Sequence, residues 1–146
     1  MKLRRIPVVV LLTLLVLVGW PGIRTASAAS THQGLPVLSK NAFGFMELRV
    51  EQLAGSMSSK NFTLVNVHVP DQGSLPNTDV SIPFDQIKSS LAKLPGKDAP
   101  IVVYCRSGGM SVQAAATLAA AGYTKIYDLK GGFNAWKAAG HDLLKK

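Results

Sequence analysis

Hydrophobic side chains along the chain recur with two spacings, which predict strands and helices in turn. Residues 62–69 are rich in β-branched and aromatic side chains that alternate between two faces, as in a strand, and 43–48 suggest a shorter first strand. Apolar residues over 50–57, and again over 84–94, recur three and four positions apart, which is the spacing of a helix face. The second helix would carry the chain back, so that residues 101–104 can pair parallel to 62–69.

The next stretch of the chain predicts a strand, a loop and a helix in direct succession. Residues 101–104, Ile-Val-Val-Tyr, suit a strand that is buried on both faces. The pair Gly108-Gly109 allows a tight backbone turn, and the alanine-rich run 112–121 has strong helix propensity and is followed by a glycine. A last strand at 125–129 and a short helix that ends at Gly140 complete the pattern.

The first 28 residues have the pattern of a secretory signal peptide. Basic side chains within residues 1–5 are followed by an apolar run from Ile6 to Trp20 and by the small residues Ala26-Ser27-Ala28. The apolar run is shorter than the roughly 20 residues that span a bilayer, so we expect cleavage after Ala28 and no retained anchor. These features predict an exported protein, either periplasmic or secreted.

The rest of the chain is long enough for one domain. After a signal peptide at 1–28, residues 29–42 are polar and aperiodic and predict a flexible leader, while 43–146 can form a single core. The formal net charge of +8 falls to about +4, because four basic side chains would leave with the peptide. The remaining lysines are scattered, without interleaved aromatic residues. We therefore expect no nucleic-acid binding. We also expect no membrane binding after signal cleavage, and a monomer.

Cys105 is the only cysteine of the chain, and its setting favours a reactive thiol. A loop that leads into a helix N-terminus points backbone N–H groups inward, and the helix adds partial positive charge there. Such a site lowers the pKa of a thiol, and the thiolate is the form that attacks sulfur or phosphorus. Arg106 would add a fixed positive charge. A buried structural cysteine is the alternative, although an exported chain with one unpaired cysteine favours chemistry.

From Cys105 onward the chain carries a series of motifs: Cys-Arg-Ser-Gly-Gly-Met-Ser at 105–111, the alanine-rich helix, Gly122-Tyr123, the strand at 125–129 and Gly-Gly-Phe-Asn-Ala-Trp at 131–136. In their order and spacing these motifs resemble those of a single-domain rhodanese. The resemblance is close over residues 101–140 and weaker back to about residue 45. It implies an α/β, rhodanese-like fold, with a central parallel five-stranded sheet flanked by helices on both faces.

The resemblance also implies an activity, that of a sulfurtransferase. In that family a cysteine accepts a sulfane sulfur, holds it as a persulfide among loop amides and passes it to a nucleophile. On this chain the cysteine is Cys105, the donor would be a small anion such as thiosulfate, and the acceptor would be a thiol, a thioredoxin-like protein or cyanide. The residues expected to bind the substrate are Arg106, Ser107, Gly108, Gly109, Met110, Ser111 and His68.

Several positions depart from the family pattern. Rhodaneses commonly carry an aspartate and an arginine where this chain has Asn66 and His68, and a Gly-His-Ile-Pro-Gly-Ala-like turn where it has residues 73–78. We expect Asn66 to hydrogen-bond to nearby backbone. His68 ends its strand beside the ligand crevice of a parallel sheet, where it is either a substrate contact or base, or a structural histidine. Met110 replaces a residue that is often polar or cationic, which leaves the site less positive.

Two other functions remain open. A cysteine phosphatase or arsenate reductase would use the same loop for a tetrahedral oxyanion. The loop of those enzymes is one residue longer and closes with an arginine, whereas here Met110 and Ser111 follow Gly109. A non-catalytic sulfur-carrier module, or one that binds a partner, is the other alternative. We expect no metal and no cofactor, because the histidines are scattered, Cys105 stands alone and a dinucleotide-binding motif is absent from the sequence.

Overall fold

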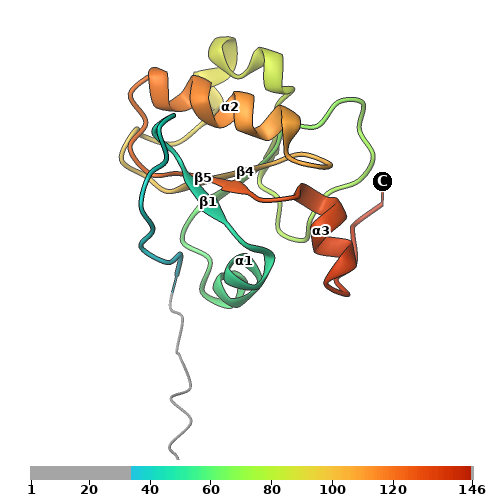
Figure 1. Ribbon diagram of the computed structural model, residues 1–146. Coiled ribbons are helices and arrows are strands. Elements are labelled where there is room, and N and C mark those ends of the chain that lie inside the picture. Colours follow the sequence, from blue (N-terminus) through green and yellow to red (C-terminus); the bar gives the residue numbers. More distant parts are fainter. Residues whose placement is uncertain (1–33, 146) are drawn as a thin grey trace, which may run out of the picture. The chain divides into compact units, whose positions relative to one another are not determined.

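The computed structural model describes residues 34–145 (Figure 1). The predicted signal peptide at 1–28 and the first part of the predicted leader lie outside these described residues. The strands are β1 (Met46–Leu48), β2 (Thr63–Asn66), β3 (Val80–Ser81), β4 (Ile101–Tyr104) and β5 (Ile126–Leu129), the α-helices are α1 (Val50–Ser56), α2 (Gly109–Ala120) and α3 (Gly132–Ala138), and the 3-10 helices are η1 (Met57–Ser59), η2 (Phe84–Gln86) and η3 (Lys88–Lys93).

The strands form one parallel sheet with β4 at its centre, in the order β1-β5-β4-β2-β3. Helix α2 covers one face of this sheet, and α1 and α3 cover the other (Figure 1). This arrangement confirms the α/β fold with five parallel strands and helices on both faces. Each parallel strand ends at the same edge, so the carboxyl end of β4 opens next to those of β2 and β5.

Strand β4 is buried on both faces, as its sequence predicts. Val103 packs toward α2 in a core with Val65 and Leu118, whereas Val102 and Tyr104 pack in a second core on the opposite face. All four residues of β4 have 0 % relative exposure. The central strand therefore gives the loop after it a fixed starting point.

The segment 84–94 differs from its predicted α-helix. Its apolar positions do face the core on the α2 side, but the backbone forms the 3-10 helices η2 and η3 instead. Ser90 has non-helical angles (φ −113°, ψ 16°), which interrupt the second of them. Serine competes for backbone hydrogen bonds and so favours caps and turns over helix interiors. The apolar spacing was thus correct, but the type of helix was not.

The described part of the predicted leader, residues 34–42, lies against the domain. The Ser56 hydroxyl donates a hydrogen bond to the Gly34 carbonyl at 2.8 Å, and the Tyr127 hydroxyl donates one to the Pro36 carbonyl at 3.1 Å. Leu35 and Leu38 are partly buried against the α1 and α3 core. In the described range 34–145, no helix has both the length and the apolar character that a membrane span requires.

Candidate active site

Cys105 follows β4 directly, and its sulfur faces the N-terminus of α2. The backbone N–H of Gly108 donates a hydrogen bond to Cys105 Sγ at 3.0 Å. Gly108 has a φ of +108°, a left-handed angle that glycine adopts without steric cost, and it caps the helix that begins at Gly109. The loop therefore turns its N–H groups toward the sulfur, as the sequence predicts.

Hydrogen bonds lower the pKa of the Cys105 thiol below its ordinary value. Burial of the thiol is the largest influence and raises the pKa, since Cys105 has only 2 % relative exposure. It is outweighed by the Ser111 hydroxyl and by the backbone N–H groups of Ser111, Gly108 and Ser107, which stabilise the thiolate. The Arg106 side chain, expected to charge the site, lies exposed. Loop amides and one hydroxyl thus favour the thiolate form of Cys105.

The first two carbonyl groups of the same loop accept hydrogen bonds from α3. The N–H groups of Phe133 and Asn134, in the first turn of α3, donate hydrogen bonds of 3.0 Å to the carbonyls of Cys105 and Arg106. Gly132 makes this approach possible, because a Cβ there would overlap with the Cys105 carbonyl oxygen. The prediction that Gly131-Gly132 is a backbone turn is confirmed. With the carbonyls held outward, the N–H groups remain for the sulfur.

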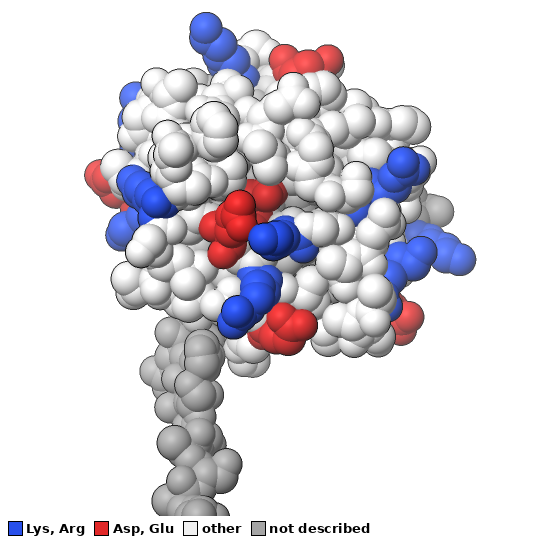
Figure 2. All heavy atoms as spheres, in the orientation of Figure 1, with Lys and Arg blue, Asp and Glu red and all other residues white. Residues whose placement is uncertain are grey.

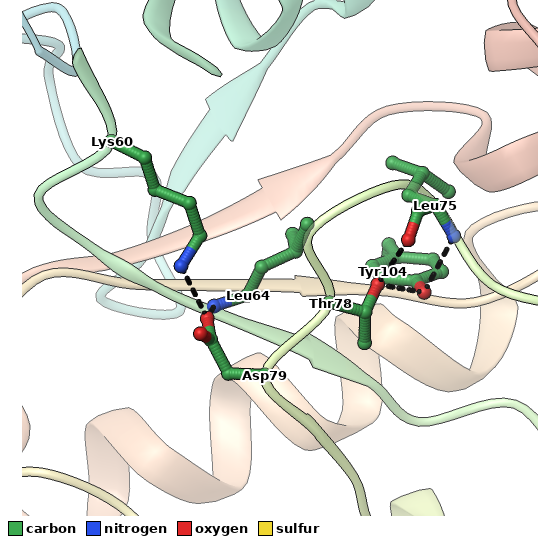
Figure 3. A network of polar contacts seen from close by, with 6 residues as sticks. All are labelled: Lys60, Leu64, Leu75, Thr78, Asp79 and Tyr104. Carbon is green, nitrogen blue, oxygen red and sulfur yellow. Dashed lines mark hydrogen bonds and ion pairs between the residues drawn. The ribbon is translucent and has the colours of Figure 1, made fainter. Parts of the chain in front are cut away.

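A polar network anchors the residue that precedes the cysteine (Figure 3). The Tyr104 hydroxyl accepts a hydrogen bond from the Leu75 N–H at 3.0 Å and shares one of 2.7 Å with the Thr78 hydroxyl. Thr78 also donates to the Leu75 carbonyl at 2.8 Å. Segment 75–78 lies where rhodaneses have the turn that this sequence lacks. Through these hydrogen bonds Tyr104 connects the segment to β4.

The same figure shows how that segment is held to the neighbouring strand. Asp79 accepts hydrogen bonds from the Leu64 N–H at 2.7 Å and from Lys60 Nζ at 2.6 Å (Figure 3). Because Leu64 lies on β2 and Tyr104 on β4, the segment is bound to both strands beside the site.

Asn66 and His68 lie at the carboxyl end of β2. Asn66 donates to the Gly73 carbonyl at 3.1 Å and accepts from the His68 N–H at 3.0 Å, which confirms its predicted structural role. The His68 ring packs edge-on against Phe133, with centroids 5.4 Å apart. Neither ring nitrogen of His68 has a hydrogen-bond partner among residues 34–145. The ring thus lies beside the α3 turn that holds the Cys105 loop, with its nitrogens unpaired.

Asp128 is a polar residue of the site that the sequence did not reveal. It lies on β5 beside Val103 of β4 and has 3 % relative exposure. Burial raises its pKa from the ordinary value of 3.8 to about 6, a hydrogen bond with the Ser111 side chain lowers it, and the Glu47 charge raises it. A lone carboxylate within an apolar strand is the sequence signal that could have identified it.

Charged side chains on the visible face of the protein do not gather in one patch. Blue and red groups lie interspersed among uncharged ones (Figure 2). Two ion pairs among the described residues, Lys60–Asp79 and Lys130–Glu47, join some of them.

Comparisons with known proteins agree with this geometry. Residues 50–139 match the rhodanese-like domain. The chain is 34 % identical over 102 residues to a sulfurtransferase of Allochromatium vinosum, an alignment that covers 67 % of this chain and 94 % of the relative. It is also 34 % identical over 98 residues to the thiosulfate sulfurtransferase GlpE of Shewanella oneidensis, covering 65 % and 95 % of the two chains.

Solved structures show the same fold. A rhodanese-related protein from Thermoplasma volcanium matches with a TM-score of 0.61 at 23 % identity, over 70 % of this chain and all of that one. A Rhodopseudomonas palustris protein described as a possible tyrosine phosphatase matches with a TM-score of 0.60 at 20 % identity, over 75 % and 99 % of the two chains. At these identities the likeness concerns the arrangement of strands and helices only.

Proposed function

Since this chain belongs to the rhodanese-like domain family, we propose that it is an exported sulfurtransferase that carries sulfane sulfur on Cys105. The observation that supports this best is the hydrogen bonding of Cys105 Sγ by the loop, with a lowered thiol pKa. The names of the relatives from Allochromatium vinosum and Shewanella oneidensis point to the same reaction.

The proposed reaction has two steps. The Cys105 thiolate attacks the outer sulfur of thiosulfate, the S–S bond of thiosulfate breaks, and sulfite leaves with the bond electrons. Cys105 now carries a persulfide anion. An acceptor thiolate or cyanide then attacks the outer sulfur, the new S–S bond breaks, and the Cys105 thiolate returns. No external oxidant or reductant is needed, because the sulfur moves between nucleophiles at each step.

The loop residues divide between holding the sulfur and contacting the donor. Backbone N–H groups of residues 106–111 would stabilise the negative charge of the persulfide as they stabilise the thiolate. The exposed Arg106 would contact the sulfonate oxygens of the donor or an anionic acceptor. His68, with unpaired ring nitrogens, is the proposed additional contact at the end of β2.

Intact mass spectrometry tests the first step. The protein incubated with thiosulfate should gain the mass of one sulfur atom, and Cys105→Ser should not. Added cyanide should remove the extra sulfur and release thiocyanate. A chain that loads sulfur and returns it only slowly to cyanide would act as a carrier, whereas no mass gain would contradict the proposal.

The phosphatase alternative is tested with an aryl phosphate. The loop lacks the closing arginine that grips phosphate, since Met110 and Ser111 follow Gly109. We therefore expect no phosphate release above that of Cys105→Ser. Release that depends on Cys105 would replace the sulfurtransferase proposal.

A further inference from the structure

Asp128 lies behind the sulfur site, on the face of the sheet that α2 covers. In parallel strands, paired residues project to the same side, and Asp128 pairs with Val103, which belongs to the α2-side core together with Cys105. The carboxyl group is almost fully buried, and its Oδ1 has no hydrogen-bond partner among the described residues. An unpaired carboxylate oxygen at such a position is costly, so the group invites a functional explanation.

Ser111 connects Asp128 to the sulfur. Its side chain is fully buried in the first turn of α2. It lowers the pKa of both the Cys105 thiol and the Asp128 carboxyl group, so its hydroxyl is near enough to stabilise either anion. The same hydroxyl lies 3.2 Å from the Gly108 carbonyl, a long contact for a hydroxyl donor. A serine hydroxyl has one hydrogen to donate, so three acceptors compete for it: the thiolate, the carboxylate and the carbonyl.

We infer that Asp128 is a positioning residue that directs the Ser111 hydroxyl to the Cys105 sulfur when its carboxyl group carries a proton. In that state the Asp128 O–H donates to Ser111 Oγ, and the Ser111 O–H is free to donate to the thiolate. The three side chains then form a directed chain of two hydrogen bonds that ends on the sulfur. When the carboxyl group loses its proton to solvent, the carboxylate becomes an acceptor and competes for the Ser111 hydrogen.

The surroundings of Asp128 determine how this competition responds to pH. On β1, Glu47 pairs with Asp128 across the sheet and raises its pKa, although Glu47 is exposed and bound to Lys130 at 3.2 Å. From β4 the thiolate of Cys105 is the other negative group, while α2 contributes the neutral Ser111. Ionisation of Asp128 above about pH 6 would therefore weaken thiolate stabilisation both by taking the hydroxyl and by adding negative charge.

The test is the pH titration of the Cys105 thiolate, followed by its ultraviolet absorbance and by the rate of iodoacetamide alkylation. Asp128→Asn supplies a permanent N–H donor to Ser111 Oγ and carries no charge. It should move the thiolate midpoint down by about one pH unit, the size expected for one hydrogen bond to a charged group. Ser111→Ala should move the midpoint up. An unchanged midpoint in a folded Asp128→Asn would overturn the inference.

The double variant separates the hydroxyl from simple charge repulsion. With Ser111→Ala present, Asp128→Asn should lose most of its effect on the midpoint, because the connecting hydroxyl is absent. An equally large effect in that background would show that the charge acts directly, which would contradict a positioning role. The inference extends the proposed function, but the titration of the thiolate requires no sulfur transfer. Even if the protein did not load sulfur, the titration would therefore still show whether Asp128 positions the Ser111 hydroxyl.

Discussion

At the scale of single residues, Asp128 makes the stability of the fold depend on pH in an unusual direction. Its pKa in the folded protein, about 6, lies above its ordinary value of 3.8. Between these values the folded state holds a proton that the unfolded chain has released, so this group's contribution to stability falls as pH rises through that range. Above pH 6 the loss is complete, at about 3 kcal/mol, since each pKa unit corresponds to about 1.4 kcal/mol.

Asp128→Asn should remove this dependence. Relative to the unmodified protein, its free energy of unfolding should rise by about 2.5 kcal/mol between pH 4 and pH 8, because asparagine does not ionise. Urea denaturation at the two pH values measures the difference. The control is Asp85→Asn, which changes an exposed carboxyl group. If the curves of Asp128→Asn and the unmodified protein run parallel with pH, Asp128 is not a perturbed acid.

Tyr104→Phe should loosen the segment beside the cysteine. The change removes the hydroxyl that binds the Leu75 N–H and Thr78, and leaves that buried N–H without its acceptor (Figure 3). A buried unsatisfied N–H costs about 2 kcal/mol in the free energy of unfolding, which urea denaturation can measure. The Cys105 thiolate should still form, because no loop N–H is altered. Full stability in the variant would show that another group binds Leu75.

The sequence predicted the nucleophile and its amides but not the groups behind them. Cys105, the glycine turn and the role of Asn66 followed from local patterns of turn, helix and polar residues. The Ser111 hydroxyl and Asp128 lie 17 positions apart in the numbering, and they come together because α2 packs against β5 in the folded sheet. The hydrophobic pattern predicts residues 126–129 as one buried strand. It does not show which side chains the Asp128 carboxylate contacts in the folded protein.

At the scale of elements, α3 supports the loop from behind. Its first N–H groups bind the Cys105 and Arg106 carbonyls, and the adjacent Gly132 has a φ of +55°. Sequence alone indicated a turn at this position, but not its partner. It also predicted an α-helix over 84–94, where the backbone forms 3-10 helices and Ser90 has non-helical angles. Periodicity thus found the buried faces, while backbone geometry depended on local hydrogen bonding.

Gly132→Ala should damage both stability and sulfur loading. The added methyl group overlaps with the Cys105 carbonyl oxygen, so the loop and α3 must separate. We expect a loss of at least about 2 kcal/mol in the free energy of unfolding and slower persulfide formation by mass spectrometry. The matched control is Gly55→Ala, since a methyl group at this position near the C-terminal end of α1 meets nothing within 4 Å. That control should be neutral or up to about 1 kcal/mol more stable.

At the scale of the whole molecule, the segment before β1 belongs to the described domain by its contacts. Gly34 and Pro36 accept hydrogen bonds from Ser56 and Tyr127, and Leu35 and Leu38 cover part of the α1 and α3 core. The sequence suggested a leader here because residues 29–42 lack periodicity. Periodicity cannot detect a segment that is held by side chains from elsewhere in the fold.

Export and this segment can be tested together. We expect N-terminal sequencing of the exported protein to begin at Ala29, which keeps residues 34–38. A variant that begins at Lys40 should lose about 3 kcal/mol of unfolding free energy relative to one that begins at Ala29, from two hydrogen bonds and two partly buried leucines. Equal stability would show that these contacts contribute little. An uncleaved N-terminus in the exported fraction would contradict the signal peptide.

The hydrogen bonds from α3 to the Cys105 and Arg106 carbonyls affect how the loop would respond to the proposed reaction. Peptide units that are gripped on their oxygen side cannot invert when the sulfur changes from thiolate to persulfide and back. In the proposed reaction the same loop N–H groups would then stabilise the thiolate and the persulfide in turn, with little reorganisation between the two steps. A mobile loop would have to reorient its dipoles at every turnover.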